Sequence, residues 1–535
     1  MKRRAFVFLA ALTASFAALA VTVTLHGGAG KVGGSCATVC EGTAAQLTND
    51  TAQAARILID CGSAFDGRAS CGFPFDPKKY GALVLTHAHQ DHAARVPELF
   101  NAGFTGTVWT TEATRDLLRV VWKSQIVYDT CTVRDWRWTR FGKMAVTYVH
   151  WRPECEWSQK IRPDYLGALH GTAEEMQGAV RAKKSGVSGF PSACDKCQEL
   201  EMEFAMKHMR TVPFDAPFET GPFRVTLNPV KHLPGSACAR VEVDGTSLVF
   251  SGDLGTTRSH LVTSIPPAAK ADVVFVEATY GDADYGTPET IAQDYRAFRE
   301  TIGRTVRAGG IAWIPAFALD RTQRVLLEIK RAIDEGELPE STPLYVLSPS
   351  ARAFTELYVT HPDWFDLPEM ADVKPLYERS RKSFSPKAKL RNGAVVVTSS
   401  GSLDAGKSRK LLPDLVAREK TQICLVGYQG PGTYGAQLRA LAQSGATNAV
   451  LTLREGKVTQ KVPVRAKTRF FGCFSGHGDA RENDAWLAHN HDSKIFLIHG
   501  EGASLEARAE KLRAAGIGSS VEIAAPNRIY EFSRK

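Results

Sequence analysis

The stretch ALVLTHAHQDH (Ala82 to His92) carries the strongest structural signal in the sequence. Its apolar run ALVL is typical of a buried strand. Four side chains that can bind a metal follow this strand within six residues: His87, His89, Asp91 and His92. Because residues two apart in an extended loop can point the same way, His87 and His89 can share one cation while Asp91 and His92 turn to another. Imidazole and carboxylate ligands together suit zinc best, with manganese or iron as substitutes.

Three further strand-like segments end in residues of the same kind. FRVTLNPVKHLPGSA contains His232, SLVFSGDLG contains Asp253, and KIFLIHG contains His499. Each of these residues alone would more often be structural, but their joint occurrence at strand ends predicts one metal centre. Polar residues at strand ends are typical of layered α/β folds, in which ligands bind beside the carboxyl ends of strands.

The strand pattern is interrupted twice along the chain. It is lost between about residues 130 and 209, which we interpret as an insertion. From Pro288 to about Ser444 helical and strand patterns alternate, which predicts a second, parallel α/β domain. VPVRAKTRFF (Val462 to Phe471) then resumes the strands. We therefore expect a first domain over 21–287, an interrupting domain over 288–444, and a return to the first domain over 445–535.

The first 20 residues differ from the rest of the chain. Lys2, Arg3 and Arg4 precede an uncharged run from Ala5 that ends in Ala-Leu-Ala, which is the pattern of a secretory signal and is short for a membrane-spanning helix. The Arg pair resembles a twin-arginine export signal. We expect export to the periplasm and no stable membrane span after processing. The alternative is a cytoplasmic protein whose start codon has been assigned too far upstream.

Composition excludes several classes of protein. With 535 residues, 44% hydrophobic and 23% charged residues, the chain is neither disordered nor a polytopic membrane protein. Eleven cysteines are too few for a disulfide framework. The net charge of +9, from 66 Lys and Arg against 57 Asp and Glu, is compatible with a polyanionic partner but small for a protein that coats nucleic acid.

Together these motifs resemble a known family. The order D-x-G (Asp60 in IDCG), H-x-H-x-D-H, His, Asp and a final His resembles the metallo-β-lactamase fold, and further motifs resemble its nucleic-acid-processing β-CASP branch. The resemblance runs from about Val21 to the end, apart from the insertion. It implies an α/β protein in which a four-layer αββα metallo-β-lactamase domain is interrupted by a β-CASP α/β clamp domain that covers the active site.

The resemblance also implies a role for each candidate residue. It implies two zinc ions per chain, with Mn²⁺ as a possible substitute. His87, His89 and His232 would hold one ion, and Asp91, His92 and His499 would hold the other. Asp253 would bridge the two ions. Asp60 would orient ligand histidines from behind. Glu277 in VEATYG and His477 in FSGHGD match the first two β-CASP motifs. The candidate catalytic residues are thus Asp60, Asp91, Glu277 and His477.

The clamp and the insertion supply weaker candidates. AFALDRTQRVL and VGYQGPGTYGAQL resemble the family's clamp motifs and imply that Arg321, Gln323 and Tyr428 bind substrate, whereas LSPSARA and SSGSLDAG depart from the family's pattern. The insertion contains three cysteines that could bind a structural zinc ion: Cys155, Cys194 and Cys197. The alternatives are that they are buried thiols or form disulfides. The tryptophans and arginines of the insertion could stack on single-stranded bases or form the core of the lobe.

These residues predict a zinc-dependent hydrolase that cleaves phosphodiester bonds of RNA, as an endonuclease or a 5′-processing nuclease. Two zinc ions generate hydroxide near neutral pH and stabilise an in-line displacement. The leaving oxygen needs a proton, which His477 can supply because the carboxylate of Glu277 favours imidazolium. The expected partner is single-stranded RNA, and DNA remains an alternative because no residue can be assigned to the 2′-hydroxyl. Further alternatives are a small-molecule hydrolase of the same fold and a catalytically inactive scaffold.

Overall fold

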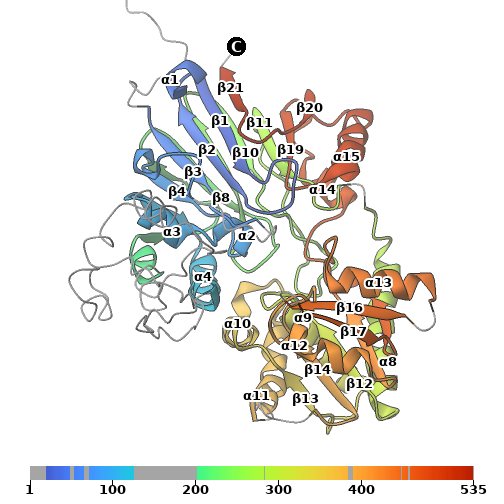
Figure 1. Cartoon of the computed structure of the whole chain (residues 1–535). Coiled ribbons are helices and arrows are strands. Elements are labelled where there is room, and N and C mark those ends of the chain that lie inside the picture. Colours follow the sequence, from blue (N-terminus) through green and yellow to red (C-terminus); the bar gives the residue numbers. More distant parts are fainter. Residues whose placement is uncertain are drawn as a thin grey trace, which may run out of the picture.

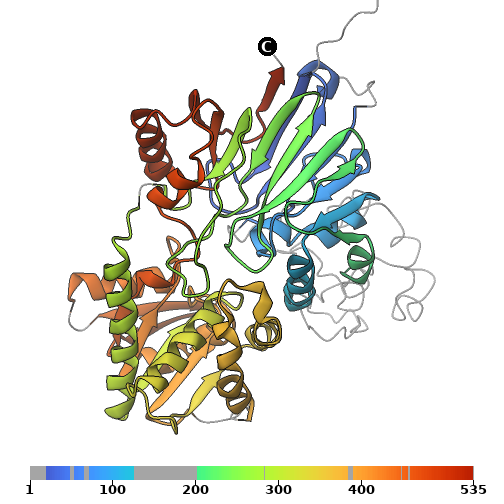
Figure 2. The same ribbon diagram turned by 180° about the vertical axis from the view of Figure 1, so that it is seen from behind.

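The computed structural model describes residues 20–48, 54–64, 72–125, 202–281, 283–382, 390–446, 449–455 and 458–533. The signal-like segment before Ala20 and nearly all of the predicted insertion lie outside these ranges. Within them, no helix is both long enough and apolar enough to cross a membrane. Figures 1 and 2 show two domains, one built on paired sheets and one on a single sheet with helices around it.

The first domain is built on two seven-stranded sheets packed face to face. One sheet has the order β21 (Ile529–Ser533), β1 (Ala20–Gly27), β2 (Cys36–Glu41), β3 (Arg56–Ile59), β4 (Ala82–Val84), β5 (Thr107–Thr110) and β6 (Met209–Thr211). The other has the order β20 (Ser520–Ile523), β19 (Lys494–Ile498), β11 (Val273–Glu277), β10 (Thr246–Phe250), β9 (Ala237–Val243), β8 (Phe223–Pro229) and β7 (Phe218–Thr220). Because β1 pairs antiparallel with β21, the first and last described strands lie side by side (Figure 1).

Helices cover the outer face of each sheet. Beside the first sheet lie η1 (Pro77–Lys79), α2 (Gln90–Ala93), α3 (Val96–Asn101) and α4 (Glu112–Gln125), and beside the second lie α14 (Ala480–Trp486) and α15 (Gly502–Ala514). The short helix α1 (Ala44–Thr48) lies at the end of the first sheet (Figure 1). In β3, Ile57 and Ile59 pack between the two sheets, whereas Leu58 packs against the helices. Strands covered on both faces are apolar at every position, which explains the unbroken run ALVL.

The second domain is a five-stranded parallel sheet with helices on both faces. Its strand order is β13 (Leu344–Val346), β14 (Ala394–Thr398), β12 (Ile311–Pro315), β15 (Thr421–Leu425) and β18 (Lys467–Phe470). One face carries α8 (Pro288–Arg307), α9 (Arg321–Asp334), α10 (Pro349–Thr360), η3 (Pro362–Trp364), η4 (Pro368–Val373) and α11 (Lys374–Lys382). The other carries α12 (Gly406–Val416), α13 (Tyr434–Ser444) and the hairpin of β16 (Val450–Glu455) and β17 (Val458–Pro463).

The predicted fold class, a four-layer αββα domain interrupted by an α/β domain, is confirmed. The place where the chain returns to the first domain differs from the expected residue 445. Both β16–β17 and β18 lie with the second domain, because β18 pairs with β15. The return follows η5 (Gly472–Phe474). A strand pattern shows that a segment is extended but not which sheet it joins, and the prediction that 462–471 belongs to the first domain is wrong.

Candidate metal centre

Seven side chains that can bind a metal converge from four separate segments of the first domain. His87 and His89 lie in the loop after β4, and Asp91 and His92 lie at the start of α2. His232 lies between β8 and β9, Asp253 follows β10, and His499 follows β19. Six of the seven are buried, and His89 is partly exposed. The residues that the sequence singled out as candidate ligands are therefore brought together in one place.

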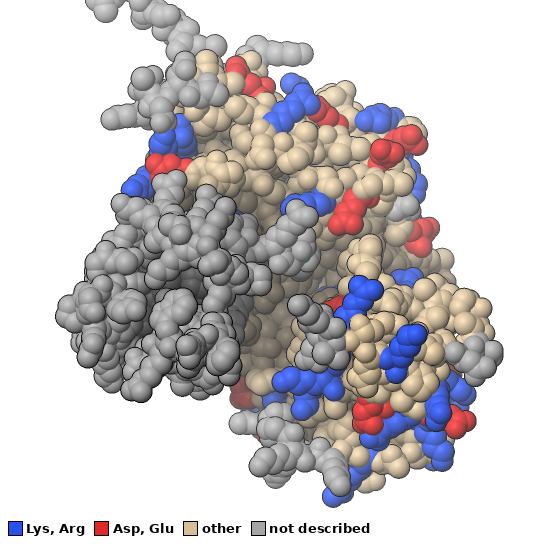
Figure 3. Space-filling model, viewed as in Figure 1, with Lys and Arg blue, Asp and Glu red and all other residues tan. Residues whose placement is uncertain are grey.

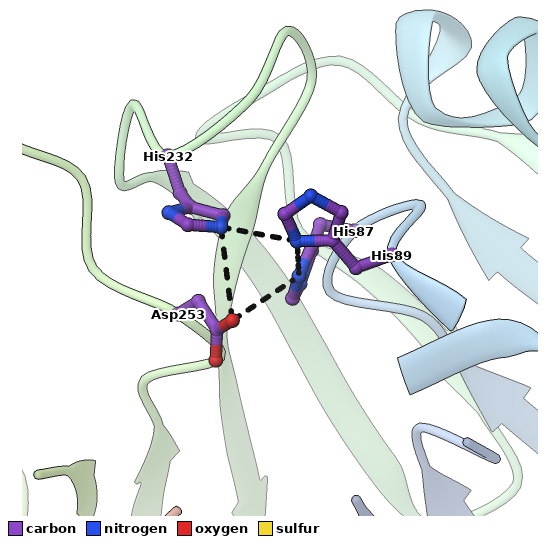
Figure 4. A group of neighbouring side chains, drawn as sticks. All are labelled: His87, His89, His232 and Asp253. Carbon is purple, nitrogen blue, oxygen red and sulfur yellow. Dashed lines mark hydrogen bonds and ion pairs between the residues drawn. The ribbon is translucent and has the colours of Figure 1, made fainter. Parts of the chain in front are cut away.

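The first group consists of His87, His89, His232 and Asp253, with one ligand atom of each within 4.8 Å of the others (Figure 4). The Nδ1 of His89 lies 3.3 Å from the Nε2 of His87 and 3.1 Å from the Nε2 of His232. The Oδ2 of Asp253 lies 3.5 Å from His87 and 3.7 Å from His232. Three nitrogens and one oxygen around a common point form the donor set that zinc prefers.

The second group consists of Asp91, His92, His499 and again Asp253. The Nε2 of His499 lies 3.1 Å from the Oδ2 of Asp91, and the Nε2 of His92 lies 3.1 Å from the Oδ1 of Asp253. Asp253 thus faces the first group with one oxygen and the second group with the other. Its buried Oδ1 has no hydrogen bond of good geometry within the described residues, only the ring nitrogens of His92 at 3.1 Å and His499 at 3.6 Å, and a cation bound among these atoms would neutralise the carboxylate. The residues present therefore fit two metal ions that share Asp253.

Hydrogen bonds behind the ligands fix the imidazole rings. The Nδ1 of His92 donates to the Oδ2 of Asp60 at 2.7 Å, and the Nδ1 of His232 donates to the carbonyl of Gly476 at 2.8 Å. The Nδ1 of His87 lies 3.0 Å from the hydroxyl of Thr86. In each of these three rings the Nε2 is then left to face the cluster. Such supporting contacts set the tautomer and the orientation of ligand histidines.

Asp60 has a second function in this support. Its two carboxylate oxygens accept hydrogen bonds from the backbone N–H and the hydroxyl of Thr86, both at 2.8 Å. Thr86 directly precedes His87, so Asp60 holds both the strand end that carries His87 and the ring of His92. The backbone of Asp60 has a φ of 59°, in the left-handed region.

The electrostatics separate the histidines into two kinds. Burial lowers the pKa of His87, His89 and His232, in the case of His89 to about 3, so these rings are neutral and able to bind a cation. Burial also disfavours the charged form of His92 and His499. Nearby carboxylates outweigh it, chiefly Asp253, and raise the pKa of both rings. The site holds concentrated negative charge, which a dication would neutralise.

Glu277 and His477 lie beside this cluster. Glu277 is the last residue of β11 and is buried, and its Oε1 lies 3.0 Å from the Nδ1 of His477. The backbone N–H groups of Leu254 and Thr279 donate to the same carboxylate at 2.8 and 3.1 Å. Burial opposes ionisation of Glu277, but the His477 imidazole outweighs it and lowers the pKa of the carboxyl.

The ring of His477 stands at the edge of the cluster. Its centroid lies 4.6 Å from that of His232, and 17% of the His477 side chain is exposed. With Nδ1 engaged by Glu277, the Nε2 of His477 is available to exchange a proton with a bound molecule.

Three residues of the second domain, the predicted clamp, were expected to bind substrate, and they differ in their placement. Tyr428 is 44% exposed. Arg321 is partly buried and donates through Nη1 to the carbonyl of Val426 at 2.7 Å, while its Nη2 lies beside Gly476. Gln323 is fully buried, and its amide donates to the carbonyls of Ala318 and Ala351. The prediction for Gln323 is therefore wrong in this structure: its position in α9 points it into the core of the clamp.

Several functional contacts were missed from the sequence. Thr279 lies 2.9 Å from the Nδ1 of His499, and the Nη2 of Arg258 donates to the carbonyl of His477 at 2.5 Å. Thr279 lies two residues after Glu277, a position that could have been noticed, but the carbonyl of Gly476 carries no sequence signal at all. The predicted cysteine site of Cys155, Cys194 and Cys197 lies outside the described residues.

Two family models match the chain. A model described as the Beta-Casp domain matches residues 322–438, in the second domain. One described as the Zn-dependent metallo-hydrolase RNA specificity domain matches residues 461–526. The two matches together reach from the clamp to the segment that carries His477 and His499.

Curated relatives match almost the whole length of the chain. Ribonuclease TTHA0252 of Thermus thermophilus is 28% identical over 495 residues, which cover 88% of this chain and 94% of that protein. Transcription termination factor FttA of Methanocaldococcus jannaschii is 26% identical over 509 residues, 90% of this chain and 67% of that protein. Endoribonuclease YSH1 of Candida albicans is 24% identical over 468 residues, 84% of this chain and 46% of that protein.

Proposed function

Since the chain belongs to the β-CASP family of metallo-β-lactamase-fold proteins, we propose that it is a zinc-dependent hydrolase that cleaves phosphodiester bonds of single-stranded RNA. The names of two of the relatives described above, a ribonuclease and an endoribonuclease, support RNA as the substrate. On the face drawn in Figure 3, Lys and Arg side chains predominate over Asp and Glu on the second domain, which favours a polyanionic substrate.

We assign one zinc ion to each of the two groups of ligands. His87, His89 and His232 would hold the first ion, Asp91, His92 and His499 the second, and Asp253 would contact both. When bound, such a pair of ions supplies hydroxide near neutral pH and neutralises charge on the phosphate oxygens.

His477 is the group that we assign to the leaving oxygen. Glu277 accepts the hydrogen bond from Nδ1 and thereby orients the ring, which leaves Nε2 to deliver a proton to the leaving oxygen. Glu277 is itself held by the backbone N–H groups of Leu254 and Thr279, so the ring has one preferred orientation. Arg258 fixes the segment from behind through the carbonyl of His477.

The observation that carries this proposal is the Glu277–His477 pair beside the metal ligands. An alkoxide leaving group needs a proton, which this pair is placed to supply, whereas the thiolate of a thioester leaves without one. A small-molecule hydrolase of the same fold is the second candidate, and DNA cleavage is the third, because the described residues do not assign a contact to the 2′-hydroxyl.

The test compares three substrates and four proteins. The zinc-loaded protein, Asp91→Ala, His477→Ala and the control His489→Ala are assayed on labelled single-stranded RNA, single-stranded DNA and a chromogenic β-lactam. His489 is exposed and lies outside the cluster. We expect RNA cleavage by the unsubstituted protein, none by Asp91→Ala, and a loss of about 10²-fold or more for His477→Ala, as for a general acid.

The control His489→Ala should cleave RNA at the unsubstituted rate. Bound zinc, measured by elemental analysis, should be unchanged in His477→Ala, which would separate a defect in proton transfer from a loss of metal. Turnover of the β-lactam with no cleavage of RNA would overturn the proposal.

A further inference from the structure

Two aromatic side chains stand exposed at one edge of the second-domain sheet. Phe317 is 37% exposed and Tyr428 is 44% exposed, and they are two of the five large hydrophobic side chains recorded as exposed in the described ranges. Phe317 follows β12 and Tyr428 follows β15, which are parallel neighbours. Because the carboxyl ends of parallel neighbours lie at the same edge, the two rings share that edge.

This edge is a topological switch point of the sheet. From β12 the chain continues into α9, which packs on one face, and from β15 it continues into α13, which packs on the other. The carboxyl ends of β12 and β15 therefore flank the place where successive connections diverge. Ligands of open α/β sheets bind at such places.

The ring of Phe317 occupies a slot between two glycines. A Cβ atom at Gly401 would lie 3.2 Å from the ring, and one at Gly427 would lie 3.0 Å from it, closer than ordinary contact. Neither glycine has a positive φ, so backbone conformation does not require glycine at either position. The space taken by the Phe317 ring explains both. The carbonyl of Phe317 accepts hydrogen bonds from the N–H and the hydroxyl of Thr322, which fix its backbone.

The loop that carries Tyr428 is equally well held. The side-chain amide of the buried Gln429 donates to the carbonyls of Gly401 and Gly427 at 3.1 and 3.0 Å. Arg321 donates to the carbonyl of Val426 at 2.7 Å. These bonds join the ends of β14 and β15 to the start of α9, so both exposed rings stand on a rigid support. A rigid aromatic surface binds a flat ligand with a small loss of conformational entropy.

The same edge faces the metal ligands. The Nη2 of Arg321 lies 3.4 Å from the Cβ position of Gly476, whose carbonyl holds His232. Burial and, after it, the nearby carboxylate of Glu501 raise the pKa of Tyr428. Glu501 lies two residues after the ligand His499, so Tyr428 is on the side of the second domain that meets the segment of His499.

We propose that Phe317 and Tyr428 stack on bases of the single-stranded RNA that the metal centre cleaves. This inference rests on the proposed function, and it adds how the strand is recognised. Every base has a π face, so stacking accepts any sequence, but it requires bases that are not already stacked in a duplex. The two rings would thus select single strands, whereas the metal centre would contact only the phosphate.

The test measures binding in the zinc-loaded Asp91→Ala background, in which we expect the strand to stay intact. The probe is a short labelled single-stranded RNA, compared by fluorescence anisotropy with versions in which abasic nucleotides are scanned along the strand. With both rings present, abasic nucleotides at the stacking positions should weaken binding about 5- to 150-fold per base. With Phe317→Ala and Tyr428→Ala combined, the natural strand should bind more weakly and the abasic penalty should disappear.

Three controls separate stacking from a general loss of structure. Phe317→Tyr and Tyr428→Phe retain a ring and should keep the abasic penalty. Phe214→Ala removes a ring that is 38% exposed but lies between β6 and β7 of the first domain, and it should change nothing. An abasic penalty that persists in the double variant, or that is absent with both rings present, would overturn the inference.

Failure of the proposed function would be visible separately. Stacking does not depend on the sugar, so single-stranded DNA should show the same pattern of binding. RNA cleavage is read from the unsubstituted protein in a parallel assay. Loss of RNA cleavage with an intact abasic pattern would contradict the ribonuclease proposal alone.

Discussion

The left-handed backbone of Asp60 illustrates how the centre is built at the scale of one residue. A φ of 59° is unfavourable for residues other than glycine, and of these asparagine and aspartate tolerate it best. Here it aims one carboxylate at both Thr86 and His92. Strain at such positions persists only where the surroundings hold it. Asp60 is therefore best understood as the residue that positions the ligands.

Replacing Asp60 by asparagine tests that role. Asp60→Asn keeps the tolerance for a positive φ but loses the negative charge of the group that accepts the hydrogen bond from the Nδ1 of His92. Zinc affinity, measured by competition with a chromophoric chelator, should fall about 10- to 100-fold. Asp215→Asn is the matched control, because Asp215 also has a positive φ, 61°, but is exposed and away from the centre. Equal zinc affinity in Asp60→Asn and the unsubstituted protein would contradict the assignment.

His26 gives the protein a pH dependence of stability that is independent of the metal centre. Burial lowers the pKa of His26 from 6.5 to about 4, and its Nε2 lies 2.7 Å from the hydroxyl of Thr38. The unfolded chain takes up a proton below pH 6.5, whereas the folded protein does not until about pH 4. The stabilisation is therefore complete above pH 6.5 and is lost as the pH falls towards 4, by up to about 3 kcal/mol.

His26→Gln should flatten this dependence. Free energies of unfolding, measured in urea with a chelator present to remove the metals, should converge for the two proteins between pH 7.5 and 4.5. The variant should lose less stability over this range. Parallel curves for the variant and the unsubstituted protein would show that His26 is not the responsible group.

At the scale of elements, α14 connects helix capping to the active site. Asp479 caps the helix by accepting hydrogen bonds from the N–H groups of Arg481 and Glu482, and Glu482 returns a bond to the backbone of Asp479. Glu482 also accepts from Thr257, in the loop before Arg258. The cap lies two residues after His477, so the start of this helix fixes where that ring stands.

Removing the cap should therefore reduce both stability and turnover. Asp479→Ala should lower the free energy of unfolding by about 1 kcal/mol, the usual cost of a lost N-cap. Thr287→Ala removes the cap of α8, whose side chain accepts from Thr290, and should reduce stability alone. RNA cleavage by both variants, together with urea denaturation, distinguishes the two effects. Unchanged turnover in Asp479→Ala would show that the cap does not position His477.

Elements were easier to predict than their partners. ALVLTHAHQDH, FRVTLNPVKHLPGSA and KIFLIHG are predicted to form strands that end in polar residues, and β4, β8 and β19 lie within these segments. The partner of β18 was not predictable, because its parallel pairing with β15 depends on the placement of chain more than 40 residues away. The same limit applies to Gln323, whose burial depends on α10 packing against α9.

At the scale of the whole molecule, the proposed recognition of RNA rests on the metal centre and the second domain rather than on net charge. The +9 of the whole sequence includes Lys2, Arg3 and Arg4, in the segment outside the described residues, which leaves +6 for the rest. So small an excess over so long a chain does not bind RNA by itself. The ligand motifs were sufficient to predict the fold and the cluster. The groups behind the ligands were not, since backbone carbonyls such as that of Gly476 leave no trace in sequence.

The most direct test of the central claim is a zinc titration of the metal-free protein, read out as the rate of single-stranded RNA cleavage. Two groups of ligands share Asp253, and in the proposed mechanism both ions would be needed to activate the nucleophile and to neutralise the phosphate. The rate should therefore rise to a plateau at two equivalents of zinc per chain. A plateau at one equivalent, or no RNA cleavage at any zinc concentration, would contradict the account.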